Sequence, residues 1–152
     1  MNKLSNFLSV LVHKCWVFYY MSKICVALMV RACRHDASKF SKYEEPYFRK
    51  YSTRLGKSVY GSKEYKGHMQ TIKIALKHHY ANNSHHPEFH DNGFDDMSLL
   101  DKIELLADWK SANKRHKKDD ILNSLEVNQE RFGYTDAEKE RLKKTLKETK
   151  ML

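Results

Sequence analysis

Histidine is concentrated in one short segment of this chain, and that segment limits how the rest can fold. Residues 78–90 contain five of the nine histidines in a chain of 152 residues. Neutral imidazole is the commonest protein ligand for transition metals, and carboxylates nearby widen the choice to zinc, iron, manganese, cobalt or nickel. The segment is either a polar surface loop or part of a metal site. We favour a site for one or two divalent metal ions, because ordering so many polar side chains is costly without a ligand.

The overall composition fits one soluble domain of ordinary size. Hydrophobic residues make up 41% and charged residues 31% of the chain, which is typical of a globular protein. With only 5 Gly and 2 Pro, a fold of many tight β-turns is disfavoured. The 3 cysteines at positions 15, 25 and 33 form no CxxC motif, which indicates buried free thiols in a reducing cytoplasm.

Charge is distributed unevenly along the chain. The formal net charge is +9, but residues 1–84 carry +11, residues 85–109 carry −6 and residues 110–152 carry +4. An acidic segment beside the histidines suits a bound cation, and the basic surroundings would attract a small anionic substrate. Nucleic acid is a less favoured partner, because the sequence has no RNP motif, zinc finger or Gly-rich KH loop.

The most apolar part of the sequence is residues 4–33, where Leu4, Phe7, Leu8 and Leu11 recur at helical spacing. The segment predicts one long helix or two joined helices. Lysine and arginine residues interrupt each apolar run well before the roughly 20 residues that a membrane span needs. The pattern therefore favours a buried core hairpin over a signal peptide or membrane span, and no membrane partner is expected.

The remaining pattern predicts an all-α fold, with a single domain over residues 1–152 and five to seven helices. Helices are expected over residues 41–54, 63–80, 98–114, 119–132 and 136–149, with loops over 55–62 and 81–97. Ser98 with Asp101, and Thr135 with Glu138, have the spacing of helix-capping pairs. The last helix carries mostly alternating charge, which is typical of a solvated cover.

Several potential metal ligands lie on or between these helices, in the order His13, His35-Asp36, His79, His85/His86 and Asp108. This order resembles the HD-domain superfamily of metal-dependent phosphohydrolases, which are all-helical. In those proteins a first-helix histidine, a His-Asp pair and a distant aspartate hold one metal, and intervening histidines hold a second metal in binuclear members. The resemblance implies that His13, His35, Asp36 and Asp108 bind one metal and that His79 and His86 bind a second.

A closer resemblance is to an uncharacterised family of bacterial and phage proteins grouped with the HD-type hydrolases. Its His-Asp-x-Ser-Lys-Phe segment matches residues 35–40, and its His-His-Tyr-x-x-Asn-x-His-His-Pro-Glu segment matches residues 78–88. Further motifs match Met97 to Ala112, including Glu104, Asp108 and Trp109, and residues 124–132. The match spans roughly residues 10–135 and implies a site, but no substrate.

Such a site would hydrolyse a small phosphorylated compound, for which a nucleotide is our first expectation, with water activated by the metal. Asp36, Glu88 and Glu104 are the candidate catalytic residues, the two glutamates by orienting a histidine ring or carrying a proton. The candidate substrate-binding residues are Lys39, Asn83, Arg115, Asn128 and Arg131. Two alternatives stay open: an HD-type di-iron oxygenase, and a non-catalytic accessory protein that binds metal or nucleic acid.

The histidine-rich loop itself has a predicted conformation. Asn82-Asn83-Ser84 favours turns over helix, so the preceding helix should end near Tyr80. Pro87 restricts His86 to an extended conformation. We expect His79 and His86 to turn toward the His-Asp pair, with Asn83 tying the loop and Glu88 accepting a ring N–H.

Overall fold

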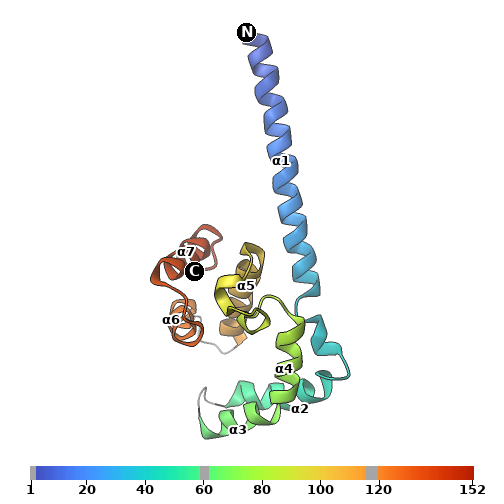
Figure 1. Ribbon diagram of the computed structural model, residues 1–152, viewed down its shortest axis with the longest axis vertical. Helices are drawn as coiled ribbons and strands as arrows, with labels where there is room; N and C mark the ends of the chain where they lie inside the picture. Colours follow the sequence, from blue (N-terminus) through green and yellow to red (C-terminus); the bar gives the residue numbers. More distant parts are fainter. Residues whose placement is uncertain (1–2, 59–61, 116–119) are drawn as a thin grey trace. The chain divides into compact units, whose positions relative to one another are not determined.

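The computed structural model describes residues 3–58, 62–115 and 120–152, and in these ranges it is helical with no β-strand (Figure 1). This confirms the predicted all-α class. The α-helices are α1 (Lys3–Arg34), α2 (Glu45–Lys57), α3 (Lys63–Thr71), α4 (Lys73–Asn82), α5 (Leu99–Arg115), α6 (Ile121–Phe132) and α7 (Asp136–Glu148). Three short 3₁₀ helices connect them: η1 (Ala37–Phe40), η2 (Pro87–Phe89) and η3 (Gly93–Asp96).

The chain divides into two compact units, Met1–His35 and Asp36–Leu152. The first unit is helix α1 and the residues beside it. The second unit contains the other helices that the structure describes. The single domain that the sequence predicts over residues 1–152 stays a prediction.

Helix α1 is continuous for 32 residues, so the predicted core hairpin is wrong. The lysines of this stretch interrupt its apolar pattern but not its backbone hydrogen bonds, and residues 3–34 contain no glycine or proline that would end the helix. Large apolar side chains remain exposed along it, as do the three cysteines that were predicted to be buried. Among the described helices, α1 alone has the length and apolar composition to cross a membrane.

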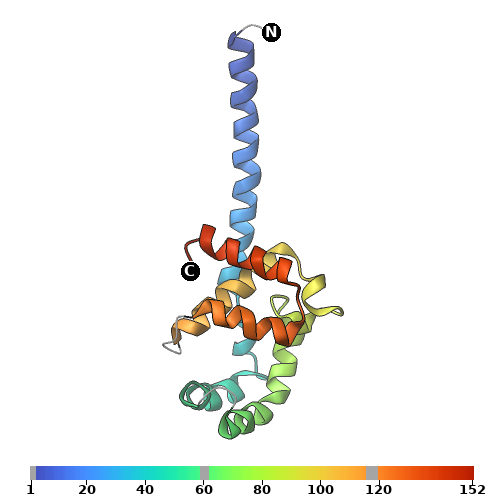
Figure 2. The same ribbon diagram turned by 90° about the vertical axis from the view of Figure 1, so that its left-hand side faces the viewer.

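The hydrophobic core of the second unit is built by its C-terminal helices. Phe94 and Met97 precede α5, and they join Leu105 and Leu106 of α5 in one buried cluster. The other buried members of this cluster are Ile121, Leu125, Tyr134, Leu142 and Leu146. Figure 2 shows α5, α6 and α7 together in this part of the unit. The two predicted capping pairs are present, at Ser98–Asp101 before α5 and at Thr135–Glu138 before α7.

The single helix predicted over residues 63–80 is two helices, α3 and α4. Ile72 separates them with φ −91° and ψ 6°, outside the α-helical region, and its side chain is buried. Burial of this apolar side chain accompanies a change of helix direction that is visible in Figure 1. After the bend, Ala75 and His79 form the buried face of α4. The bend therefore determines where His79 lies.

Candidate metal centre

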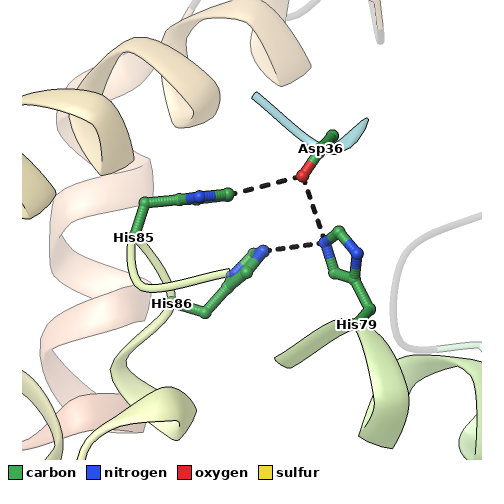
Figure 3. A group of neighbouring side chains, drawn as sticks. All are labelled: Asp36, His79, His85 and His86. Carbon is green, nitrogen blue, oxygen red and sulfur yellow. Dashed lines mark hydrogen bonds and ion pairs between the residues drawn. The ribbon is translucent and has the colours of Figure 1, made fainter. Parts of the chain in front are cut away.

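Four side chains of the second unit converge on one point: Asp36, His79, His85 and His86 (Figure 3). Each offers one nitrogen or oxygen atom, and these four atoms lie within 4.8 Å of one another. The His79 Nε2 atom is 3.1 Å from Asp36 Oδ1 and 3.0 Å from His86 Nε2. The His85 Nε2 atom is 3.5 Å from the same Asp36 oxygen. Three imidazoles and a carboxylate are thus brought together from three separate segments.

The backbone at Asp36 adopts an unusual conformation. Its φ of 57° and ψ of 18° are left-handed, a region that aspartate tolerates better than most residues. The turn is closed by the Lys39 amide, which donates to the Asp36 carbonyl at 2.9 Å. The Lys39 ammonium also pairs with Asp36 Oδ2 at 2.5 Å, so one carboxylate oxygen faces a lysine and the other faces the histidines.

Two further carboxylates, those of Glu44 and Glu104, contact the Nδ1 atoms of two of these histidines. Glu44 is completely buried, and its Oε2 atom is 2.9 Å from His79 Nδ1. Glu104 Oε1 lies 3.2 Å from His85 Nδ1. When Nδ1 carries the proton and donates it to a carboxylate, Nε2 keeps the lone pair that a metal binds. In both histidines Nε2 is the atom that faces Asp36.

The burial of Glu44 is explained by its hydrogen bonds. Its Oε1 atom is 2.6 Å from His78 Nδ1, and the Ser38 hydroxyl donates to Oε2 at 3.1 Å. A buried carboxylate is costly unless hydrogen bonds replace its hydration, and two histidines and a serine supply them here. His78 therefore belongs to the support of the centre rather than to its donor atoms.

The Asn83 side chain links η1 to α4. Its side-chain amide donates to the Ser38 hydroxyl and to the His79 carbonyl, each at 2.7 Å. The two N–H donors of the amide are therefore engaged by the protein itself. This is the predicted tying role, and a role for Asn83 in substrate binding stays a prediction.

The protonation state of His86 favours metal binding. Burial, with the neighbouring His85 and His79, lowers the pKa of His86 to about 3, although Asp108 and Asp36 raise it. The ring is therefore neutral near pH 7. Asp108 lies close by on α5 and offers a carboxylate oxygen within 4.8 Å of a His85 ring nitrogen. Three imidazoles with one or two carboxylates suit zinc, iron, manganese, cobalt or nickel.

His13 and His35, which the family resemblance assigned to one metal, lie far apart along α1. His13 and His35 are 22 residues apart, and α1 is one helix over Lys3–Arg34, so about 33 Å separates them along its axis. The two cannot share one ion within a chain of this conformation, and the prediction that they do is wrong. His35 is the last residue of the first unit, and its role as a metal ligand stays a prediction.

The predicted role of Glu88 at a histidine ring is also wrong. Its carboxylate pairs with Arg131 at 2.5 Å on the surface of the unit. Glu88 lies in the helical turn η2, and its carboxylate contacts Arg131 instead of a histidine ring. Arg131 is hydrogen-bonded to the Tyr80 hydroxyl as well, and the Tyr80 ring lies 4.9 Å from the His86 ring.

The other predicted substrate-binding residues have different positions. Lys39 is at the edge of the centre through its contact with Asp36. Asn128 is half-buried on α6. Arg115 ends α5, and its side chain lies outside the described ones.

Sequence reasoning missed the roles of His85 and Glu44. It expected each His-His pair to place one ring in the site, whereas His85 and His86 both enter, with ring centroids 4.1 Å apart. Glu44 is one of two glutamates that follow residues 35–40, and the sequence pattern did not assign a role to either. Its place eight residues after Asp36 carried no recognisable spacing, because the contact with His79 spans 35 residues.

The fold and this centre define the class of protein. It is an all-helical protein with a cluster of histidines and carboxylates. The model of a family of unknown function (DUF5662) matches residues 2–151, and the chain belongs to that family. No curated protein and no solved structure matches the chain.

Proposed function

We propose that this chain is a metal-dependent phosphohydrolase that acts on phosphate esters of small compounds, nucleotides among them. The observation that carries the proposal is the arrangement of the centre: Nε2 of His79 and of His85 face one carboxylate, and each ring is held from behind by another carboxylate. Carboxylate–histidine pairs of this kind orient metal ligands in proteins.

Asp36, His79, His85 and His86 would hold the metal, with Asp108 as a further donor. Zinc, manganese, iron, cobalt and nickel fit this donor set, and the number of ions is one or two. Such an ion would supply a Lewis acid and an activated water for hydrolysis. The chain's own residues would do the positioning: Glu104 would orient the His85 ring, and Asp108, near His85, would accept a proton.

Lys39 is the residue best placed to hold the substrate phosphate. Its side chain is 35% exposed, and its ammonium touches the outer oxygen of Asp36. A phosphate oxygen that approaches Asp36 from solvent would therefore meet this positive charge, which favours anionic over neutral substrates. The net charge of +9 adds a weaker, long-range attraction for the same substrates.

The test is a screen of the purified full chain with added manganese, cobalt, nickel, zinc or iron. Its substrates are a phosphomonoester, a phosphodiester and a set of nucleotides. We expect metal-dependent release of phosphate from the wild type, and a loss of at least about 100-fold in Asp36→Asn, which removes a ligand charge. Asp91→Asn changes an exposed aspartate and should keep full activity.

Equal residual activity in the wild type and Asp36→Asn would indicate contamination and contradict the proposal. Bound iron with an absorption change in air, and no phosphate release with any metal, would point to an oxygenase. Bound metal with neither activity would point to an accessory protein.

A further inference from the structure

A basic cleft lies next to the candidate metal centre, within the second unit. Its volume is about 830 Å³, in the range of known ligand sites. Four cationic side chains from three helices line it: Lys66 of α3, Lys73 and Lys77 of α4, and Arg131 of α6. The single carboxylate among its lining residues is Glu88, and it is paired with Arg131.

The lysines of the cleft are available for an anionic ligand. Lys66, Lys73 and Lys77 are all exposed, and among the described residues none of them pairs with a carboxylate. Lys73 and Lys77 are four residues apart on α4 and therefore lie side by side. Lys66 lies beyond the bend at Ile72, so the positive charge extends along the cleft rather than surrounding one point.

Aromatic side chains stand among these cations. Phe89 is 45% exposed, and Tyr80 lines the cleft beside it. Positive side chains that follow a groove, with aromatic faces on which bases stack, are the features by which proteins bind single-stranded nucleic acid. A mononucleotide would neutralise a smaller part of the charge that the lysines of α3 and α4 supply along the cleft.

Tyr80 also connects the cleft to the metal centre. The residue lines the cleft, and its ring centroid lies 4.9 Å from that of His86 and 6.0 Å from that of His79. A ligand that stacks on Tyr80 would therefore be one aromatic ring away from the donor atoms of the centre.

We propose that this cleft binds single-stranded nucleic acid, with phosphates on the lysines and a base on Phe89 or Tyr80. The end of the strand is then presented to the centre, so that a terminal phosphate or the last phosphodiester is hydrolysed. The hydrolysis of the strand rests on the proposed function, whereas its binding does not. The sequence disfavoured nucleic acid because it lacks a known binding motif, and the cleft supplies the features without the motif.

Binding is tested separately from hydrolysis, in full-length Asp36→Asn without added metal. The probe is a fluorescent single strand of about 12 nucleotides, within the usual site sizes, followed by anisotropy over a series of salt concentrations. Each phosphate contact contributes about 0.7 to the slope of log affinity against log salt for a single strand. We expect Lys73→Gln with Lys77→Gln to reduce that slope by roughly 1.4.

Two further variants separate stacking from diffuse charge. Phe89→Ala should weaken binding by roughly tenfold without changing the salt slope, because it removes an aromatic face and no charge. Lys144→Gln with Lys147→Gln, on α7, is the matched control and should leave affinity and slope unchanged.

The proposal is overturned if the control pair reduces the slope as much as the cleft pair, or if a duplex of the same sequence binds equally well. It is also overturned if a free mononucleotide displaces the strand completely at the same concentration of bases, which would make the cleft a mononucleotide site. Strand binding that depends on the cleft, in a wild type that releases no phosphate with any metal, would support the cleft and refute the hydrolase.

Discussion

Helix α1 and the unit Asp36–Leu152 distribute polarity in opposite ways. Along α1 the side chains of Phe18 and Met29 are 75% and 67% exposed, although they are strongly apolar. In the second unit Glu44 and His79 are 0% and 2% exposed, although they are titratable. The comparison shows that polarity alone does not determine burial. A polar group is buried where other groups satisfy its hydrogen bonds, and an apolar composition does not by itself bury a helix.

The largest expected difference between the two regions concerns bound metal. His79→Ala removes a ring nitrogen from the middle of the cluster, and we expect the purified protein to lose its metal. His13→Ala removes an exposed ring on α1 and should leave the metal content at the wild-type value. Elemental analysis gives the metal per chain, and circular dichroism checks that both variants remain helical. Metal loss in His13→Ala would show that α1 contributes to the centre after all.

The sequence was sufficient for those parts of the fold that depend on local chemistry. The caps at Ser98 and Thr135 and the turn residues at Asn82-Asn83 act within a few residues, so the start of α5, the start of α7 and the end of α4 were predictable. The continuity of α1 was not, because the same apolar pattern fits a buried hairpin and an exposed helix. The contact between Glu44 and His79 was not predictable either, since it depends on how α2 and α4 pack.

A second difference should appear on acidification of the metal-free protein. The folded state lowers the pKa of His86 to about 3, mainly by burial, while the unfolded chain binds that proton near pH 6.5. Between these values the unfolded state binds more protons, so the free energy of unfolding falls as the pH falls. One such group contributes up to about 1.4 kcal/mol per pH unit in this window.

The measurement is urea unfolding in the presence of a chelator between pH 7 and pH 4, for the wild type and His86→Gln. The variant removes the titrating ring, so its stability should decrease less steeply with falling pH. Identical slopes for the two proteins would mean that His86 is not held neutral by the fold.

A third difference concerns how much each region loses in stability when a leucine is truncated. Leu125 is 0% exposed in the core of the second unit, and Leu11 of α1 is 46% exposed. Leu125→Ala should reduce the free energy of unfolding by about 2–5 kcal/mol, because it leaves a cavity. Leu11→Ala should change it by less than about 0.5 kcal/mol. Urea unfolding followed by near-ultraviolet circular dichroism compares the two, and a large cost for Leu11→Ala would show that the apolar face of α1 is packed in solution.

The smallest expected effect concerns the carboxylates that hold the histidines. Glu104→Gln keeps the shape of the side chain but removes the charge that orients His85 through Nδ1 at 3.2 Å. Loss of such a support weakens metal binding by about 10- to 100-fold, and we expect the lower end because the amide oxygen still accepts the ring N–H.

Glu64→Gln is a matched control, since Glu64 is 71% exposed and lies 3.5 Å from His68 on the surface of α3. Titration with a competing chelator measures both affinities. The Glu64 variant should match the wild type, because a solvated carboxylate near a histidine contributes little, whereas a largely buried one determines which ring nitrogen keeps its lone pair. Equal affinities for the Glu104 variant and the wild type would mean that packing alone orients His85, and the similarity to a carboxylate–histidine–metal arrangement would then be geometric without being functional.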